Sequence, residues 1–556
     1  MNNKIAELND IVNGYIKWLY ENDSYNVARV LEQLIVNTFK EIHVDPTNLF
    51  SIEYSEVSNS NISKKLSDLS EFTSDRKKRG VYYTPTDLVD YMLYNASLKK
   101  ITSLYQKSYN TEDIMDIIVK QNENLIFNYC TKTTIFDPTC GSGEFILQAV
   151  KLKIRLLQKK MIDSKENIVR AISTIYGNDM DNFAILILKL RICIYLANII
   201  SLNETKEISN ILSNNFYVSD FVFENKIKNK FDIIVGNPPY VEYRNLPNKP
   251  KENFGNLYAN ILSNSINYLN KDGLMSYVIP ISFSSTKRMS PIRKKIFNNF
   301  KNVILLHFAD RPASLFTKVH QKLDIIIADN FSEKLSKLYT SEYNYSYKKD
   351  RDSIFDNIEI IENNNYEDEF IPKYGNKLQK SIYNKVLSNK TNMNILKILS
   401  KTDEYNAEKS IFLSKRATFF IKSFLKDPSS KEYTLYEVKG IPNKVLLAIL
   451  NSSLFWFYWN IVSDGWHIVN KDLQYFKVPD ISKIQQANLI NLADELINRL
   501  EETKVYVGTV QTEFEYKHRY AFDILDKIDA ILADIYNLNK NELLEVKNFA
   551  RKYRGG

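Results

Sequence analysis

The sequence is organised around a ten-residue stretch, Phe231-Asp232-Ile233-Ile234-Val235-Gly236 followed by Asn237-Pro238-Pro239-Tyr240. The first six residues are mostly apolar and β-branched and end in glycine, which predicts a buried strand of a parallel sheet. The two prolines end the strand, and their fixed φ angles hold the next residues extended. An amide, a carbonyl and an aromatic ring are therefore predicted at the sheet edge where ligands bind in open α/β folds. Taken alone, the stretch also fits a proline-terminated strand with a surface tyrosine.

Length and composition set the broad class of the protein. The 556 residues are enough for roughly three to four domains. A hydrophobic content of 44% and a charged content of 25% are typical of a soluble protein. We find no apolar stretch long enough to span a bilayer and no signal peptide, so a cytoplasmic protein is expected. Three cysteines without a CxxC pair argue against a disulfide framework or a structural zinc, and no metal site is expected.

The net charge of +8 permits a polyanionic partner without requiring one. Lysine is abundant along the whole chain together with asparagine, isoleucine and tyrosine, so an even surface excess of lysine explains the charge equally well.

A glycine turn precedes the central stretch, in the segment Ile135-Phe136-Asp137-Pro138-Thr139-Cys140-Gly141-Ser142-Gly143-Glu144-Phe145. The pattern predicts a strand, a tight turn and a helix. Gly141 and Gly143 let the backbone approach a ligand closely and present N–H groups at a helix amino end. Asp137 stands at the strand end, where its carboxylate can accept from an ammonium or a hydroxyl group.

Two further acids follow predicted strands. Asp179 ends the strand at 175–179, the position where Rossmann-type folds hold ribose hydroxyls, and Asp181 is a candidate helix cap. Asp220 and Phe221 follow a strand near 216–218, and they fit a loop turn or a nucleobase contact equally well. Further strands are predicted at 275–279, 303–307 and 323–328, with a turn at 271–273 before the first of them. This alternation predicts one doubly wound α/β domain.

The two ends of the chain have a different character. Residues 1–75 show helical periodicity. Beyond about 345, acidic and asparagine-rich loops lead to a second apolar segment at 445–458 and then to amphipathic helices. Basic and aromatic residues interleaved there suit a DNA-groove surface or a second core with equal weight. The candidate DNA contacts are Lys415, Arg416, Lys422, Trp466, His467 and Lys471.

In this order, the segments resemble the gamma class of methyltransferases that modify the N6 amine of adenine in DNA, enzymes of restriction-modification and related defence systems. The resemblance rests on Tyr83-Thr84-Pro85, on Asp137 to Phe145 and on Asn237 to Tyr240, and covers about residues 76–330. It extends more loosely to Leu447-Ala448-Ile449-Leu450-Asn451-Ser452-Ser453 and the helical tail, which are similar to specificity regions.

The resemblance implies S-adenosyl-L-methionine as cofactor. Its methionine part would lie near Tyr83, Thr84, Pro85, Asp137, Gly141 and Gly143. Asp179 would hold the ribose hydroxyls, and Asp220 would accept from the adenine amine of the cofactor, with Phe221 packed nearby. The catalytic set would be Asn237, Pro238, Pro239 and Tyr240, with Tyr240 and Phe316 stacking on the target base.

Periodicity and the resemblance together predict a division of the chain, and the resemblance implies a set of partners. The N-terminal helices have no counterpart in the family. The expected parts are an N-terminal helical region at 1–75, a methyltransferase domain with a doubly wound, Rossmann-like α/β fold at 76–345, an α+β target-recognition domain at 346–485 and a helical region at 486–556. Double-stranded DNA is the expected partner, and a separate restriction nuclease or other defence proteins would act with it. Two alternatives remain, methylation of RNA or of a protein glutamine, and a catalytically silent DNA-binding subunit.

Overall fold

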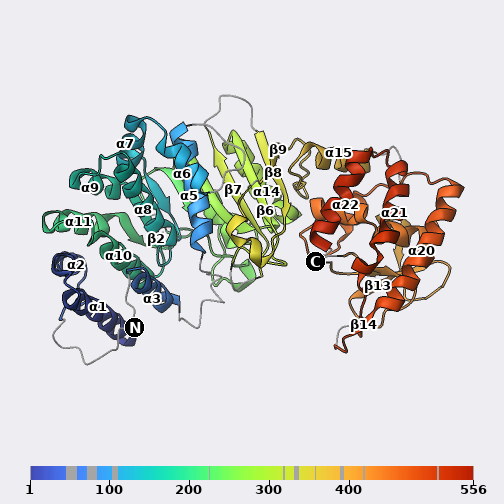
Figure 1. The fold of residues 1–556 in the computed structure, drawn as a ribbon, viewed down its shortest axis with the longest axis horizontal. Helices are drawn as coiled ribbons and strands as arrows, with labels where there is room; N and C mark the ends of the chain where they lie inside the picture. Colours follow the sequence, from blue (N-terminus) through green and yellow to red (C-terminus); the bar gives the residue numbers. More distant parts are fainter. Residues whose placement is uncertain are drawn as a thin grey trace.

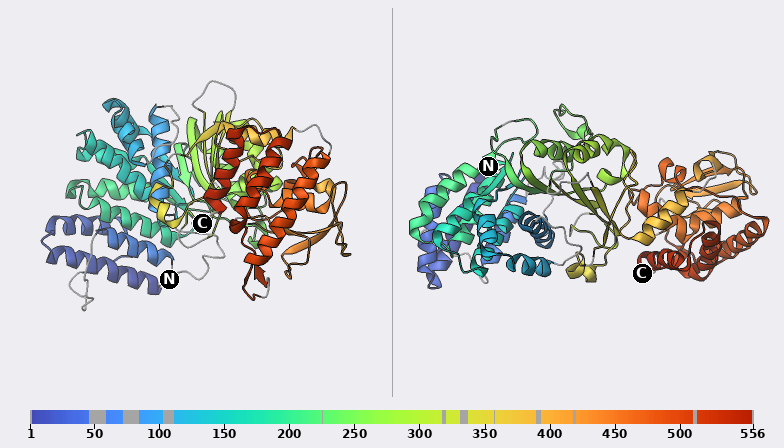
Figure 2. Two further views of the ribbon diagram at one scale, coloured as in Figure 1. Left: turned by 45° about the vertical axis from the view of Figure 1, so that its right-hand side comes forward. Right: turned by 90° about the horizontal axis from the view of Figure 1, so that it is seen from above.

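Two lobes make up the protein (Figure 1). The computed structural model describes residues 2–45, 59–71, 84–102, 111–224, 226–316, 320–330, 337–356, 358–388, 393–417, 420–509 and 513–554. The larger lobe contains a central sheet and the N-terminal helices. The smaller lobe holds the C-terminal helices and lies beside the sheet edge formed by β8 and β9, as the view from above also shows (Figure 2).

The central sheet has nine strands among the described residues, in the order β3-β2-β1-β4-β5-β7-β6-β8-β9. Strands β1 to β5 run parallel, β7 is antiparallel to both neighbours, β8 is parallel to β6, and β9 is antiparallel to β8. The strands are β1 (Ile135–Asp137), β2 (Ile175–Asp179), β3 (Phe216–Val218), β4 (Phe231–Gly236), β5 (Leu269–Pro280), β6 (Asn302–Phe308), β7 (Leu323–Asp329), β8 (Lys337–Asn344) and β9 (Ile360–Glu362). This mixed, mostly parallel sheet confirms the predicted α/β class.

Strand β4 occupies the middle of the parallel part, between β1 and β5. It is buried apart from half-buried Asp232, so the predicted central strand is confirmed. Because β1, β2, β3 and β4 are parallel, their carboxyl ends meet at one edge of the sheet. The glycine turn, Asp179, Asp220 and Asn237 follow these four ends.

The turn predicted at 271–273 is wrong. Strand β5 begins at Leu269 and includes those residues, with an irregularity in its pairing to β4: Phe231 pairs with Leu269, but Ile233 pairs with Leu274. The extra residues bulge out of the ladder without ending the strand, because pairing resumes beyond them with a shifted register. The glycine therefore marks a bulge, where sequence reasoning expected a turn.

Alternating side chains of the sheet pack against two different layers. Ile233 and Val235 face a core formed with the helices α5 to α11, whereas Phe231 and Ile234 face a second core formed with α12 and α14. The lobe's helices are α5 (Thr86–Thr102), α6 (Thr111–Val119), α7 (Glu123–Lys132), α8 (Glu144–Lys159), α9 (Lys165–Ser173), α10 (Asn182–Leu196), η1 (Leu202–Glu204), α11 (Thr205–Asn215), η2 (Tyr243–Asn245), α12 (Leu257–Asn267), α13 (Ser282–Ser285), η3 (Lys287–Met289), α14 (Ser290–Asn299) and η4 (Lys348–Ser353).

The N-terminal helices belong to the same core. They are α1 (Asn2–Glu21), α2 (Tyr25–Thr38) and α3 (Asn59–Glu71), which confirms the predicted helical character for these ranges. Their apolar faces join the core that covers one side of the sheet, and they lie beside α10 and α11 (Figure 1).

The smaller lobe has a core of its own, centred on the apolar segment of α17 and α18. Among its described residues, a four-stranded antiparallel sheet has the order β10-β13-β11-β12. The elements are α15 (Lys377–Leu387), α16 (Ile395–Ile398), β10 (Leu399–Lys401), β11 (Ser410–Ser414), β12 (Ser423–Phe424), β13 (Tyr433–Val438), α17 (Asn443–Asn451), α18 (Ser453–Val462), α19 (Asn470–Gln474), α20 (Lys483–Thr503), β14 (Val505–Tyr506), β15 (Phe514–Glu515), η5 (His518–Ala521), α21 (Phe522–Ile535) and α22 (Lys540–Arg554).

Two further observations concern the sequence-based expectations. The central sheet continues to Glu362 in β9, past the boundary expected at 345, and the division into four parts stays a prediction. Within the described residues, no single helix could cross a bilayer by length and composition, although α17 and α18, bent by 62° at their junction, pass that test as a pair.

Candidate functional site

The glycine turn between β1 and α8 requires glycine at two positions for different reasons. Gly143 has φ +90° and caps α8, and a Cβ there would lie 2.0 Å from Leu188 Cδ1. Gly141 has φ +51°, but a Cβ would meet no atom within 4 Å, because this glycine borders a cavity. One glycine thus lets the loop pack on α10, and the other keeps its backbone open to a ligand.

Asp179 braces this turn from the end of β2. Its Oδ2 accepts from the Gly141 N–H at 2.9 Å, and its Oδ1 accepts from the Asp181 N–H at 2.8 Å. Asp181 in turn caps α10 by accepting from the Phe183 N–H, as predicted. A carboxylate can accept about four hydrogen bonds, so these contacts are compatible with further donors from a ligand.

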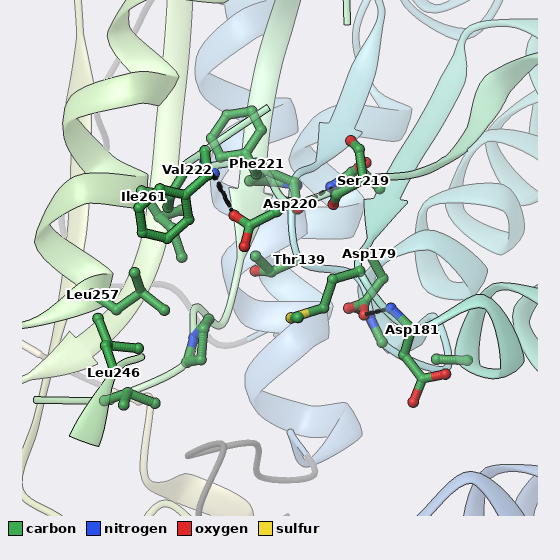
Figure 3. A pocket seen from close by; sticks show the side chains of 18 of the residues that line it. Thr139, Asp179, Asp181, Ser219, Asp220, Phe221, Val222, Leu246, Leu257 and Ile261 are labelled. Carbon is green, nitrogen blue, oxygen red and sulfur yellow. Dashed lines mark hydrogen bonds between the residues drawn. The ribbon is translucent and has the colours of Figure 1, made fainter. Parts of the chain in front are cut away.

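Asp220 and Phe221 lie across the cavity from Asp179 (Figure 3). Oδ1 of Asp220 accepts from the backbone N–H groups of Val222 at 2.9 Å and of Phe223 at 3.2 Å, which fixes the carboxylate in the turn after β3. Phe221 is buried and contacts Phe136 with ring centroids 6.0 Å apart. The turn therefore presents a fixed acceptor beside an apolar wall.

A cavity of about 400 Å³ connects these residues to the end of β4, a volume within the range of small-molecule sites. Its lining brings together the glycine turn, Asp179, Asp220 and Phe221 with Asn237 and Pro239. The remaining lining residues are Pro138, Thr139, Ser142, Asn178, Met180, Asp181, Ala184, Ser219, Val222, Phe223, Val241, Asn245, Leu246, Pro247, Asn248, Leu257 and Ile261.

Hydrogen bonds on both sides orient the Asn237 amide at the carboxyl end of β4. Its Nδ2 donates to Thr84 Oγ1 at 3.0 Å, and its Oδ1 accepts from the Tyr240 hydroxyl at 2.7 Å. The same hydroxyl lies 3.0 Å from the Val278 carbonyl oxygen, so the ring of Tyr240 is held between the ends of β4 and β5. An amide oxygen can accept two hydrogen bonds, so Tyr240 and an incoming amine can both donate to Oδ1.

Several residues predicted to bind the cofactor do not line the cavity. Tyr83 lies outside the described residues. Thr84 and Pro85 are buried just before α5, where Thr84 contacts Asn237. Gly143 acts through loop packing.

Asp137 has a different position from the one expected for a ligand-binding acid. It is 1% exposed, and its Oδ1 accepts from the Thr139 N–H at 3.0 Å. Burial raises the pKa of this carboxyl well above its ordinary value, the Thr139 N–H lowers it, and the charge of Asp179 raises it. Asp137 thus holds the start of the glycine turn through its hydrogen bond from the Thr139 N–H.

Phe316 also lies away from the cavity lining. It is 2% exposed and packs with Leu315 in the core on one face of the sheet, because the segment after β6 folds back onto that core. Tyr240 packs against the same core, and the stacking role of Phe316 stays a prediction.

Sequence reasoning missed the apolar residues that line the cavity. Met180 is 63% exposed, and Phe223 is also exposed. Leu257 and Ile261, which both belong to α12, line another side of the cavity (Figure 3). A methionine between two acids at a strand end is only a weak signal in the sequence, because single apolar residues are common on protein surfaces.

A basic and aromatic cluster, which we call the Trp466 cluster, lies where the two lobes meet. Three cations surround the indole of Trp466, with distances to the ring centroid of 4.9 Å for Arg311, 5.0 Å for Lys322 and 5.9 Å for Arg416. His467 pairs with Arg416 in an isolated β-bridge and with Asp464 at 2.8 Å. Arg416, Trp466 and His467 were predicted DNA contacts, whereas Arg311 and Lys322 come from the α/β lobe and were missed.

The other three predicted DNA contacts lie elsewhere. Lys415 is exposed and donates to the Lys431 carbonyl. Lys422 is half-buried, and burial lowers the pKa of its ammonium group while Glu515 raises it. Lys471 has a side chain only 14% exposed and donates to the Val462 carbonyl at the end of α18, and its role as a DNA contact stays a prediction.

The sheet order and the cavity at the carboxyl ends of β1 to β4 define the class of this protein: an α/β protein with a Rossmann-like, methyltransferase-type sheet and a second lobe. The DNA-bound type IIL restriction-modification enzyme MmeI supports this fold, with a TM-score of 0.53 at 14% identity, over 91% of this chain and 82% of that one.

Residues 173–316, which run from β2 to the segment after β6, match the family model described as Eco57I restriction-modification methylase. The type II methyltransferase M.VspI of Vibrio sp. (strain 343) is 25% identical over 298 residues, 52% of this chain and 54% of the relative. M.AccI of Acinetobacter calcoaceticus is 26% identical over 181 residues, 30% of this chain and 29% of the relative. Part of this chain is thus similar to the Eco57I family of restriction-modification methylases, and the match spans about half or less of these relatives' lengths.

Proposed function

We propose that this protein transfers a methyl group from S-adenosyl-L-methionine to the N6 amine of an adenine in duplex DNA. The observation that carries the proposal is the single cavity lining that joins Asp179 and Asp220 to Asn237 and Pro239. Three groups thus face one cavity. Asp179 would accept from a ribose, Asp220 would accept from a nucleobase amine, and the Asn237 amide would hold the target amine. The match of residues 173–316 to the Eco57I family model supports the same activity.

The residues of the cavity fit the cofactor. Gly141 leaves the backbone open, Asp179 would accept from the ribose hydroxyls, and fixed Asp220 would accept from the adenine amine. Met180, Phe221 and Ile261 offer apolar surface to the faces of a purine. When bound there, S-adenosylmethionine supplies an electrophilic methyl group on a sulfonium.

Asn237 and Pro238 would act on the target base. The N6 lone pair of adenine is delocalised into the ring, which makes the amine a poor nucleophile. If Asn237 Oδ1 and the Pro238 carbonyl both accept from that amine, its lone pair would localise and could attack a methyl group in line. The bond between sulfur and the methyl group would break, S-adenosylhomocysteine would leave, and the methylated amine would lose one proton to solvent. Positioning and these two fixed acceptors then supply the acceleration, without a covalent enzyme intermediate.

Tyr240 would hold the ring of the target base. The base has to leave the duplex to reach the end of β4, and stacking on an aromatic side chain stabilises it there. The hydroxyl contacts of Tyr240 with Asn237 and Val278 hold the ring in place before DNA arrives. Pro239 keeps the backbone between Asn237 and Tyr240 extended.

The substrate class is tested by incubating the protein with labelled S-adenosylmethionine and one of three acceptors: duplex DNA, RNA, or a release factor with its methylatable glutamine. The proposal expects label only in duplex DNA. Label in RNA or protein would establish the first alternative. Tight DNA binding with no transfer to any acceptor would establish the catalytically silent subunit.

Asp220→Ala is expected to weaken S-adenosylmethionine binding by about 10- to 100-fold, because a hydrogen bond to a charged group contributes roughly 1.5–3 kcal/mol. Asp220→Asn keeps one acceptor oxygen and should lose less. Isothermal titration calorimetry measures both, and Asp163→Ala, which removes an exposed carboxylate of the same lobe, is the control. Unchanged affinity in Asp220→Ala would remove this residue from the cofactor site.

The Trp466 cluster is proposed as a phosphate-binding surface. The Nε of Arg311 is buried and has no hydrogen-bond partner among the described residues, so a phosphate oxygen could satisfy it. Arg311→Ala should weaken duplex binding and reduce the slope of log affinity against log salt by about 1.

Fluorescence anisotropy over a series of KCl concentrations measures that slope. Arg170→Ala, on α9, removes the same charge from an exposed i,i+4 ion pair with Glu166 and is the matched control. Equal slopes for the two variants would show that Arg311 contacts no phosphate.

The biological setting belongs to the same proposal. Methylation would protect the host's own sites, with a separate nuclease or other defence proteins acting on unmodified DNA. The smaller lobe would read the target sequence, in line with the division into domains given above, and the protein would act in the cytoplasm of its host. Single-molecule sequencing of the host genome with and without this gene would give the modified base and its context.

A further inference from the structure

Arg191 of α10 joins three segments that are far apart in the sequence. Its side chain is 4% exposed. Nε donates to Ser63 Oγ of α3 at 2.9 Å, one terminal nitrogen donates to the Ser142 carbonyl of the glycine turn at 2.7 Å, and the other donates to Glu144 Oε2, the first residue of α8, at 2.7 Å. A buried guanidinium therefore links the N-terminal helices to both sides of the cofactor-loop backbone.

A second contact from α3 reaches the same turn. Ser67 Oγ lies 3.2 Å from Ser142 Oγ. Ser63 and Ser67 are four residues apart, so they share one face of α3. That face contacts the glycine turn and Arg191. Ser142 also lines the cavity. The N-terminal helices thus reach the wall of the cavity at Ser142.

The arrangement fits a positioning role. A buried arginine is strongly destabilising unless its donors are paired, and the planar guanidinium fixes the relative places of its acceptors. Here the acceptors are the carbonyl of Ser142 and the carboxylate of Glu144, which flank Gly143. Fixing them holds the turn in one shape before a ligand binds, which lowers the conformational entropy lost on binding.

We propose that Arg191 is a positioning residue for the cofactor loop, and that helix α3 is a structural part of the cofactor site through Ser63 and Ser67. The inference rests on the proposed function, because it takes the cavity as the S-adenosylmethionine site. The N-terminal helices, which have no role by sequence resemblance, then set the affinity for the cofactor without touching it.

The test compares Arg191→Lys and the double variant Ser63→Ala/Ser67→Ala with the wild type in the full-length protein. The measured quantities are the Kd for S-adenosylhomocysteine by calorimetry, the KM for S-adenosylmethionine, kcat on duplex DNA and the thermal midpoint. We expect Kd and KM to rise by about 10- to 50-fold for Arg191→Lys and about 3- to 10-fold for the double variant, with kcat nearly unchanged.

Arg293→Lys is the matched control. Arg293 of α14 is also buried in this lobe, and its guanidinium donates to the carbonyl oxygens of Phe283, Thr286 and Asp368, away from the cofactor loop. Its replacement should lower the thermal midpoint and leave Kd unchanged.

The outcomes separate the inference from the function on which it rests. Wild-type protein that binds no S-adenosylhomocysteine would overturn the proposed function itself. Tight binding by the wild type with unchanged Kd in both the Arg191 and the serine variants would overturn the inference alone, as would an equal loss of affinity in Arg293→Lys. Should Arg191→Lys fail to fold, the serine variant decides, because it removes two hydroxyl groups and keeps the buried charge.

Discussion

Replacing Asn237 with alanine is expected to abolish methyl transfer to duplex DNA, with a loss of at least about 1,000-fold in kcat. The amide oxygen that would accept from the target amine is then gone, so the lone pair of the amine stays in the ring. Cofactor affinity should remain largely intact, because Asp179 and Asp220 lie at other strand ends. Initial rates with labelled cofactor and calorimetric titration with S-adenosylhomocysteine measure the two effects.

The fold should tolerate this change. Tyr240 keeps the Val278 carbonyl as an acceptor when the Asn237 oxygen is removed. Asn299→Ala, which deletes an exposed amide on α14, controls for a general effect of amide removal. Wild-type-like activity in Asn237→Ala would rule out the mechanism proposed here.

Gly143→Ala is expected to lower the free energy of unfolding by about 2–5 kcal/mol. The left-handed backbone costs an alanine roughly 1–2 kcal/mol, and the new methyl group would overlap the Leu188 side chain of α10, adding roughly 1–3 kcal/mol. Gly141→Ala has only the backbone cost, because its Cβ meets open space. Thermal and urea unfolding of the two variants measure the difference.

Cofactor affinity should be lowered more by Gly141→Ala than by Gly143→Ala, the reverse of the order expected for stability. Gly141→Ala places a methyl group at the cavity wall, so its main effect should be on the Kd for S-adenosylhomocysteine. In the double variant Gly143→Ala/Leu188→Ala the loss of stability should be smaller than the sum of the two single losses, because truncating buried Leu188 removes the overlapping atoms. Equal stability of the two glycine variants would contradict the packing role assigned to Gly143.

The sequence predicted the part of the fold that depends on local pattern. The strand at 231–236, the glycine turn and the acids after β2 and β3 follow from short motifs, and parallel pairing then brings their ends to one edge. The bulge at 270–273 was missed because glycine has the same local signature in a turn and in a bulge.

Contacts between distant segments could not be read from the sequence. Arg191 lies inside an apolar helix, and nothing local indicates that its partners are Ser63, Ser142 and Glu144. In the same way, Arg311 and Lys322 meet Trp466 only because the lobes pack against each other. The burial of Asp137 could not be read from its motif either, and its place beside the cofactor stays a prediction.

The central claim is most directly tested by identifying the methylated nucleoside. Duplex DNA from a methylation-deficient host is incubated with purified protein and labelled S-adenosylmethionine, digested to nucleosides and separated by chromatography with mass detection. We predict label in N6-methyldeoxyadenosine, and none when Asn237→Ala replaces the wild type. Label in N4-methyldeoxycytidine, or equal N6-methyldeoxyadenosine from both proteins, would contradict it.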